Sequence, residues 1–325
     1  MATPFTDFVH LTEASSGAPT LCGVNGSGND VMNWALTQAG WTRIYHNAGT
    51  FESVFQPPAG GSTPCLYVCH NSAISGDARA IEVRMCESAT GYAFANLVDP
   101  VPTLAQVAHN ACNWMASSAA NGTARAFAIN VWEEGIEYFS NFGGTADVYE
   151  MGFMCKPWLR LTSDTYGWAI GQRQLTSFTS GGFLANGVGT TLSTGNAGKV
   201  FFLRNYAGTI KSTYASLRAS GNGLGSVVGT PSIFAGVGGV PEKEKVCIHC
   251  HGASTNVIAA NAVPTRACIP NLWSPVHSGL TGATYTDVFT DTAYDATADF
   301  KLIRASTSFG VFLESTNTST GFPGA

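Results

Sequence analysis

The sequence predicts a mainly β protein with sandwich-like or barrel-like lobes and two short helices. Three observations lead to this fold class: 37 glycines, many short runs of alternating apolar and polar residues, and turn residues between these runs. The clearest run is Ala126–Phe142, which predicts a β-hairpin with a turn at Glu133-Glu134-Gly135. Apolar side chains fall on both faces of this hairpin, so we expect it to lie inside a sheet.

Helical spacing of apolar residues is confined to two stretches. Asp30–Gly40 predicts the first helix, with Asn29 or Asp30 as the N-cap and Gly40 just after the C-terminus. Residues 103–117 carry an apolar stripe at helical spacing and predict the second helix.

The remaining alternating runs predict strands, and their distribution divides the chain. Strands are expected at Trp41–His46, Thr50–Gln56, Leu66–His70, Ala80–Glu87, Val148–Cys155, Lys199–Tyr206, Lys245–Cys250, Ala267–Trp273, Ala283–Thr290 and Asp299–Leu313. We therefore predict an N-terminal arm (1–29), an N-terminal β-rich domain with both helices (30–175), a linker or long loop (176–198), a C-terminal β-rich domain (199–313) and a tail (314–325).

Composition excludes several classes of protein. Only 11% of the 325 residues are charged, well below the ~25% of average soluble proteins, and the net charge is −5 without a basic run. Nucleic acid is therefore not expected as a ligand. No apolar run is long enough to span a membrane, and residues 1–18 lack the basic start and apolar centre of a signal peptide. We expect a chain made in a cytoplasm, where its nine cysteines are reduced.

The stretch Cys247-Ile248-His249-Cys250-His251 matches C-x-x-C-H, the attachment motif of c-type haem. Haem is not expected, because the motif falls in a predicted strand and no export signal is seen. Zinc would need a second ligand group, such as Cys65, Cys69 and His70 or Cys268, but the spacing fits no standard finger. We predict neither group and interpret the cysteines as small apolar side chains.

Other motifs have simpler explanations than catalysis. The run Gly23–Gly28 precedes a helix but lacks the lysine of a phosphate-binding loop, so a flexible loop is expected. A glycosidase uses a pair of carboxylates, and the hairpin offers Glu133, Glu134 and Glu137. Adjacent acids in a turn are usually solvated, so we expect no such activity from them. His109 is expected to be structural, and no G-x-S-x-G motif occurs. We assign no catalytic, cofactor-binding or metal-binding residue.

The order of short motifs resembles structural proteins of tailed bacteriophage particles. The motifs are Gly40–Thr42, Leu66–Val68, Ala80–Glu87, Ile129–Phe139, Tyr149–Phe153, Lys199–Tyr206 with Gly208, and Arg266–Trp273 with His277. Ala267 and Asn271 stand where the pattern has glycine. The resemblance implies a virion component without enzymatic activity, and it carries no site residues.

The first function hypothesis is therefore a non-enzymatic structural protein of a phage tail, neck or collar, or one that decorates the head. We expect many copies in a ring or sheath, with Met1–Asn29 touching a neighbouring chain and other virion proteins as partners. The protein would be assembled in the host cytoplasm and reside in the virion. Exposed cysteines, with Cys22 as the first candidate, could cross-link subunits in an oxidising environment.

The second hypothesis is a carbohydrate-binding or carbohydrate-degrading module on a β scaffold, associated with a phage tail. Its sugar-stacking side chains would be Trp132, Trp158, Trp168 and Trp273. Packing in a core or an interface is the favoured explanation for these tryptophans. Size separates the hypotheses, since only the first requires the protein to assemble.

Overall fold

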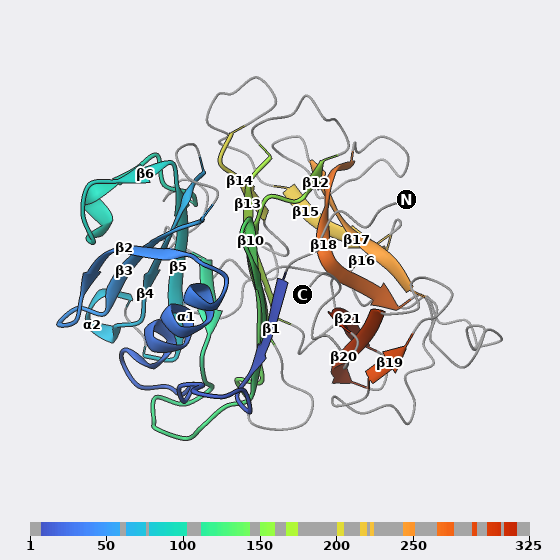
Figure 1. The fold of residues 1–325 in the computed structure, drawn as a ribbon, viewed down its shortest axis with the longest axis horizontal. Helices are drawn as coiled ribbons and strands as arrows, with labels where there is room; N and C mark the ends of the chain where they lie inside the picture. Colours follow the sequence, from blue (N-terminus) through green and yellow to red (C-terminus); the bar gives the residue numbers. More distant parts are fainter. Residues whose placement is uncertain are drawn as a thin grey trace.

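The protein is a layered, antiparallel β structure, as Figure 1 shows. The structure, a computed structural model, describes residues 8–58, 63–75, 78–102, 112–143, 150–159, 167–174 and 200–204, together with the strands from residue 215 onward. These residues confirm the predicted mainly β class and contain two short helices, α1 (Ser27–Gln38) and α2 (Ser72–Ser75). No helix in these ranges is long and apolar enough to cross a membrane.

The larger sheet is assembled from both halves of the chain. Its first strands in spatial order are β1 (Phe8–Thr12), β9 (Phe127–Trp132), β10 (Gly135–Ser140), β11 (Glu150–Cys155), β13 (Ala169–Gln174) and β14 (Val200–Phe202). It continues through β15 (Ala215–Ala219), β17 (Lys243–Cys250), β18 (Thr265–Pro275), β21 (Phe309–Thr316), β20 (Ala298–Ser306) and β19 (Val288–Thr290), with β12 (Trp158–Leu159) and β16 (Asn222–Gly223) beside this path. Because β14 pairs directly with β13, the sheet runs across the predicted domain boundary. The predicted linker, 176–198, lies outside the described residues.

The smaller sheet forms the outer layer beside α1 (Figure 1). Its strands in order are β2 (Thr42–Asn47), β3 (Glu52–Gln56), β4 (Cys65–Cys69), β5 (Ala80–Cys86) and β8 (Cys112–Met115). After β5 the chain forms a projecting ribbon, which we call the flap: residues 88–98, with β6 (Ser88–Ala89), β7 (Leu97–Val98) and the 3-10 turn η1 (Phe94–Asn96).

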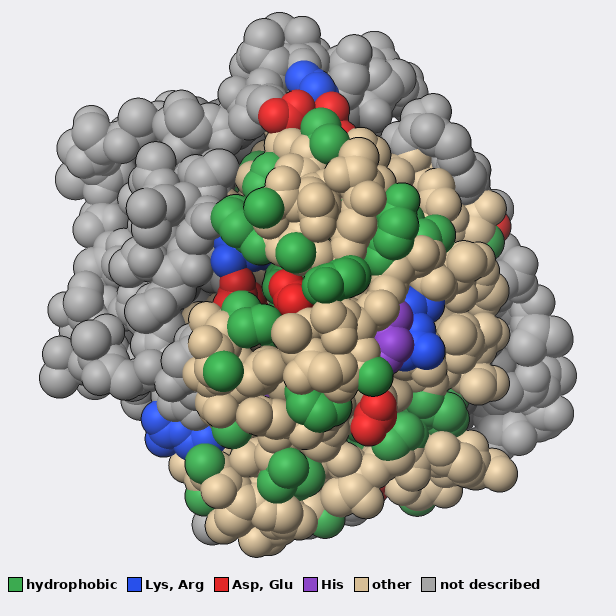
Figure 2. All heavy atoms as spheres, turned by 90° about the vertical axis from the view of Figure 1, so that its left-hand side faces the viewer, with side chains coloured by type: hydrophobic (Ala, Val, Ile, Leu, Met, Phe, Trp, Pro, Cys, Tyr) green, Lys and Arg blue, Asp and Glu red, His purple; other side chains and the backbone are tan. Residues whose placement is uncertain are grey.

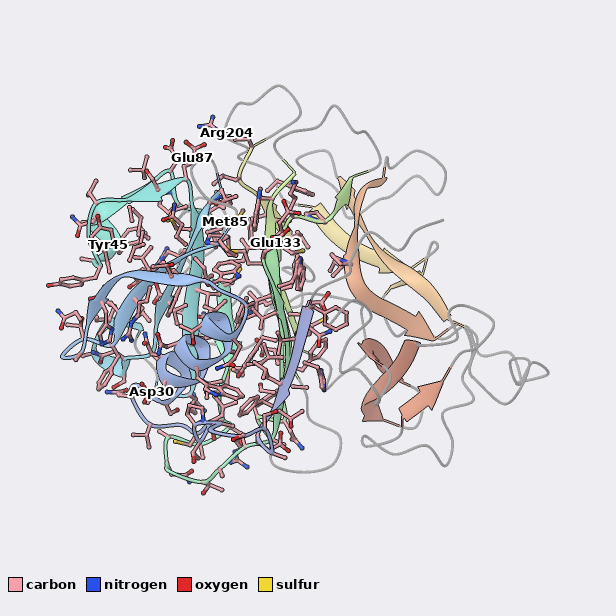
Figure 3. The ribbon with its side chains drawn as sticks, in the orientation of Figure 1. Asp30, Tyr45, Met85, Glu87, Glu133 and Arg204 are labelled. Atoms are coloured by element: carbon pink, nitrogen blue, oxygen red, sulfur yellow. The ribbon has the colours of Figure 1, made fainter. Side chains whose placement is uncertain are left out.

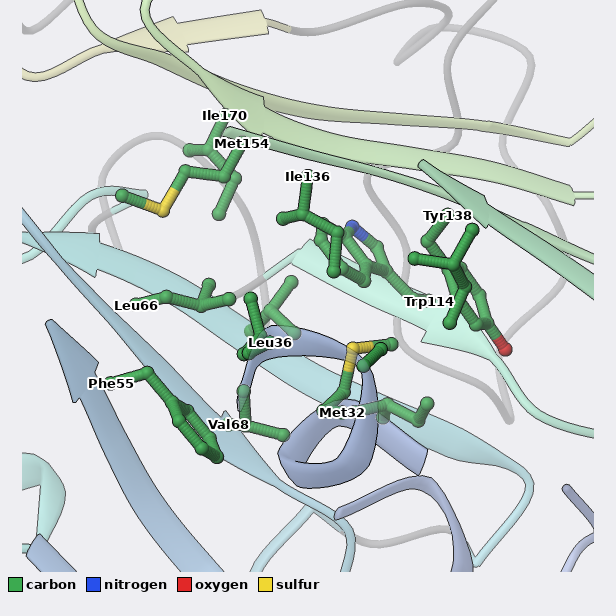
Figure 4. Close-up of a cluster of buried hydrophobic side chains, with 14 of the residues drawn as sticks. Met32, Leu36, Phe55, Leu66, Val68, Trp114, Ile136, Tyr138, Met154 and Ile170 are labelled. Atoms are coloured by element: carbon green, nitrogen blue, oxygen red, sulfur yellow. The ribbon is translucent and has the colours of Figure 1, made fainter. Parts of the chain in front are cut away.

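The main core lies between the two sheets. Figure 4 shows Met32 and Leu36 of α1 beside Leu66 and Val68 of the smaller sheet and Ile136 of the larger one. All five side chains are fully buried. The alternation of strand residues explains this arrangement, because every second side chain of β4 and β10 points to the same face.

Helix α1 ends as the sequence predicts but begins earlier. Gly40 has a φ of +78°, and the amides of Gly40 and Trp41 donate to the carbonyls of Thr37 and Leu36, which is a Schellman motif. The N-cap is Gly26, with a φ of 90°. The predicted caps, Asn29 and Asp30, lie inside the first turn, where Asn29 donates to the Phe51 carbonyl instead.

One tryptophan joins the two sheets. Trp114 of β8 stacks on Tyr138 of β10, with ring centroids 5.4 Å apart and an interplanar angle of 12°. Its Nε1 donates to the Gly171 carbonyl at 3.3 Å. The ring also lies on Gly152, where an added Cβ would be 2.4 Å from Trp114 Nε1. The absence of a side chain at residue 152 therefore makes room for the ring.

Several local predictions are corrected by the structure. Residues 112–115 of the second predicted helix form β8, because pairing with β5 buries Trp114 in the core; 103–111, including His109, lie outside the described residues. The predicted arm is folded from residue 8, since β1 pairs with β9 and α1 begins at Ser27. Cys22 is buried rather than exposed for cross-linking.

The hairpin turn and the C-terminal strands also differ from the prediction. Gly135 is not a turn residue but pairs with Trp132, and only Glu133 and Glu134 connect the strands. A Cβ at Gly135 would lie 2.3 Å from the Trp132 ring, so glycine permits close packing there. Asp299–Leu313 forms two strands, β20 and β21, instead of one, and β21 extends to Thr316 within the predicted tail.

The contact at Gly152 generates a stability prediction. Gly152→Ala should lower the free energy of unfolding by about 1–3 kcal/mol, because the new methyl group forces the Trp114 ring out of its position. Denaturant unfolding measures this change. Gly122→Ala is the matched control, since nothing lies within 4 Å of a Cβ at that position. Equal stabilities of the two variants would contradict a close contact between Trp114 and Gly152.

Candidate functional site

A row of polar side chains crosses the outer face of the smaller sheet, opposite the face that packs on α1. Asn47, Glu52, Cys69, Glu82 and Asn113 are direct neighbours across all five strands. Residues in register across antiparallel strands share a face, so these side chains form one line, the outer polar row. All except Asn47 are buried, which makes this row the first candidate for chemistry.

Hydroxyl groups occupy both oxygens of Glu52. Tyr67 Oη donates to Oε1 at 2.9 Å, and Thr50 Oγ1 donates to Oε2 at 2.7 Å. Burial, and then the charges around it, raise the pKa of Tyr67, so the phenol remains a donor. Burial and the charge of Glu82 raise the pKa of Cys69 to about 12, so this thiol remains protonated at neutral pH. The row therefore offers a stable hydrogen-bond network rather than an activated nucleophile.

Arg84 links the outer polar row to the flap. Its guanidinium forms an ion pair with Glu82 and lies over the Phe94 ring, with Cζ 4.1 Å from the ring centroid. Nε and Nη1 of Arg84 are buried and have no hydrogen-bond partner. The ring contact joins the flap to β5, and the ion pair with Glu82 on the same strand orients the guanidinium. Glu87 and Arg204 form a second ion pair near the flap (Figure 3).

His70 closes the N-terminus of α1. Its Nδ1 accepts the Gly28 amide at 2.8 Å, and its Nε2 lies 2.7 Å from the Ala78 carbonyl, which requires the proton on Nε2. The Gly-rich run before the helix thus packs against an imidazole, and a Cβ at Gly28 would lie 2.4 Å from Ile81. Since both ring nitrogens are occupied, His70 is not free to join Cys65 and Cys69 around a metal ion.

A serine and a histidine meet near the edge of the smaller sheet. His46 Nδ1 lies 2.9 Å from Ser53 Oγ, which is the distance expected for a nucleophile and its base. However, Ser53 Oγ donates its proton to Asn29 Oδ1 at 3.1 Å, and Ser53 is fully buried. The hydroxyl therefore serves a hydrogen-bond network with α1 and does not face solvent.

The acids of the central hairpin differ in their partners and in their exposure. Glu137 is buried and accepts from Asn130 Nδ2 at 3.4 Å, and His10 Nδ1 lies 2.8 Å from Asn130 Oδ1. Glu134 is partly exposed and forms an ion pair with Lys156 at 2.6 Å, whereas Glu133 is exposed in the turn. Glu137 and Glu134 are therefore held by structural partners, Asn130 and Lys156.

The residues proposed for sugar binding and for haem give different outcomes. Trp132 and Trp168 are buried, so they pack in the interior as favoured above. The side chains of Trp158 and Trp273 lie outside the described part of the structure. The C-x-x-C-H stretch enters β17, where Cys247 pairs with Cys268, which confirms the predicted strand. Within the described ranges, no group of three or more His, Cys, Asp or Glu side chains is placed to hold a metal ion.

A buried carboxyl group that the sequence did not indicate lies where the two sheets meet. Glu150 Oε1 accepts the backbone amide of Met115 at 3.2 Å, and Tyr138 Oη donates to the carbonyl of the same residue at 2.9 Å. Gln172 Oε1 accepts the Asn113 amide. Side chains of the larger sheet thus satisfy the free backbone edge of β8. Glu150 accepts this hydrogen bond only because the two sheets pack together, so no local sequence pattern could predict it.

Burial raises the pKa of Glu150 well above its ordinary value, although the Met115 amide opposes this shift. Folding therefore favours the protonated carboxyl of Glu150 over a pH range that begins near the ordinary pKa of 4.5 and extends upwards.

The raised pKa of Glu150 leads to a prediction of how the stability of the protein changes with pH. The contribution of Glu150 is complete below about pH 4.5 and is lost as pH rises towards the folded-state pKa. Glu150→Gln keeps an oxygen for the Met115 amide but has no titrating proton. We expect E150Q to gain stability relative to wild type as pH rises from 4 to 8, measured by urea unfolding. If the stabilities of E150Q and wild type changed with pH in parallel, the pKa of Glu150 would be the same in the folded and unfolded chains. E133Q, which changes an exposed carboxylate, is the control.

A second prediction concerns the cap of α1. His70→Ala should cost roughly 2–4 kcal/mol, because it leaves the buried Gly28 amide and the Ala78 carbonyl without their partner. His46→Ala removes an exposed imidazole and should cost less than about 1 kcal/mol. Urea unfolding of both variants gives the comparison. A similar small loss in both would show that His70 does not support the helix.

Comparisons with known proteins provide no relative from which a role could be transferred to these residues. The sequence matches no protein-family model, and it matches no curated protein.

Proposed function

We propose that this chain is a non-enzymatic structural subunit of a tailed-phage particle, present in many copies in the tail, neck or collar. The observation that carries the proposal is a surface with little charge, which can be covered by neighbouring subunits at low cost. The motif resemblance described above directs the proposal to a virion. Its partners would be other copies of the chain and other virion proteins.

Burial of charged side chains reduces the charge at the surface further. Charged residues make up 11% of the chain, and Glu52, Glu82, Arg84, Glu137 and Glu150 are among those buried. Figure 2 shows one face on which uncharged side chains and backbone predominate, with only scattered charges. Uncharged polar groups lose less hydration energy than ions when a partner covers them, so this surface suits an assembly.

Exposed apolar side chains occur at two places that could contact a neighbour. The flap presents Tyr92, Phe94 and Val98, which are 39%, 37% and 39% exposed. Val24, in the turn before α1, is 46% exposed, and Ile74, in α2, is 43% exposed. A hydrogen bond from the Ser72 amide to Asn25 Oδ1 at 2.9 Å joins these two segments. Such side chains gain free energy when a subunit contact removes them from water.

The reactive side chains that are described have structural partners, which supports a non-enzymatic role. His70 caps α1, Ser53 donates to Asn29, Glu52 accepts two hydroxyls, and Glu150 binds the edge of β8. Each of these groups would have to leave a hydrogen bond before it could act on a substrate.

The test is the composition of purified particles. Mass spectrometry of particles from the source phage should detect the chain in multiple copies, and electron microscopy should place it in a ring or sheath. Absence from particles would overturn the proposal. A monomeric chain that binds purified host polysaccharide, and is missing from particles, would instead favour the carbohydrate module.

A further inference from the structure

Two cysteines face each other across the middle of the smaller sheet. Cys65 of β4 and Cys86 of β5 are direct partners in the antiparallel register. The Cys86 thiol lies 3.7 Å from the Cys65 carbonyl oxygen and donates to it. Both cysteines are free and buried, with Cys65 3% and Cys86 0% exposed.

The backbone around this pair permits a disulfide. On the opposite side of β5, Met85 exchanges two hydrogen bonds with Val101, at 2.9 and 2.7 Å. Because backbone groups alternate in direction along a strand, Cys86 bonds towards β4, and Cys65 and Cys86 form a hydrogen-bonded pair. The Cα atoms of such a pair are about 5.5 Å apart, within the range of about 4.4–6.8 Å found for disulfides, whereas its Cβ atoms lie beyond the usual ~3.5–4.5 Å, so the bond would be strained and easily reduced.

The two thiols are chemically unequal. Contact with the Cys86 thiol lowers the pKa of Cys65, although burial opposes this shift, and the same contact and burial raise the pKa of Cys86. Burial raises the pKa of Cys112 and of Cys69, and these thiols have no cysteine opposite them in register. Cys65 is therefore the member of the pair that is suited to attack a disulfide.

We propose that Cys65 and Cys86 form a reversible intrachain disulfide, with oxidised glutathione as the oxidant, when a local opening of the flap brings the buried Cys65 thiol into contact with solvent. Cys65 thiolate attacks one glutathione sulfur, which forms a mixed disulfide and releases one glutathione thiolate. Cys86 then loses its proton to water, attacks Cys65 Sγ and releases the second glutathione. The two cysteines are oxidised, and one glutathione disulfide is reduced to two thiols.

The bond would fasten the base of the flap. Cys86 ends β5 directly before the flap, and Leu97 and Ala89 of the flap pack in the same cluster as both cysteines. Joining residues 65 and 86 restricts the unfolded chain and so stabilises the folded one. The inference is independent of the proposed function, although it suits a protein that folds in a reducing cytoplasm and later meets an oxidising medium.

The experiment uses the full chain, purified with reductant and then equilibrated with mixtures of reduced and oxidised glutathione. Trypsin cuts after Arg43, Arg79, Arg84 and Arg125, so the bond should join peptide 44–79 to peptide 85–125 with the loss of two hydrogen atoms. Cys69 and Cys112 lie in the same two peptides, so fragmentation of the linked pair must identify the bonded residues. The bond should raise Tm by about 5 °C, and dithiothreitol should reverse this rise.

Matched variants decide the assignment. C65S and C86S should lose both the linked peptide and the rise in Tm, whereas C69S and C112S should keep them. A bond that is mapped elsewhere, for example between Cys247 and Cys268, which are also opposite in register, would overturn the proposal if Cys65 and Cys86 stay reduced. If C65S or C86S does not fold, alkylation of oxidised wild type in denaturant decides, because unfolding exposes buried thiols: protection of both cysteines supports the bond, and labelling of both refutes it.

Discussion

The contact between Trp114 and the larger sheet determines how the two sheets are placed. Its ring, from the edge strand of one sheet, touches Tyr138 and Gly152 and donates to Gly171 on three strands of the other. A large aromatic side chain buries much apolar area and accepts few orientations in a dense core. This ring therefore fixes how β8 lies against the larger sheet.

The same junction explains why polar side chains are buried there. An edge strand carries unpaired amides and carbonyls, which are costly when they are removed from water. Glu150, Gln172 and Tyr138 provide the missing partners for β8, so the smaller sheet ends against side chains instead of a further strand. A protonated carboxyl at Glu150 fits this role because it carries no charge into the core.

Because several charged side chains are buried inside the fold, fewer charges are left on the surface. Glu52, Glu82 and Arg84 stabilise the outer face of the smaller sheet and hold the flap, and so they contribute little to the field at the surface. The surface is left with uncharged side chains and a flap that carries apolar groups. These properties connect the packing of the sheet with the proposal of a subunit that is covered by neighbours.

The sequence by itself determined the elements whose pattern is local. The alternation in β3, β4, β5 and the central hairpin, and Gly40 at the end of α1, were sufficient to predict them. Tertiary structure decided the rest. Residues 112–115 fit a helical stripe, yet they became a strand because pairing with β5 buries Trp114. The raised pKa of Glu150 and the opposition of Cys65 and Cys86 depend on how distant segments pair, and no single segment determines that pairing.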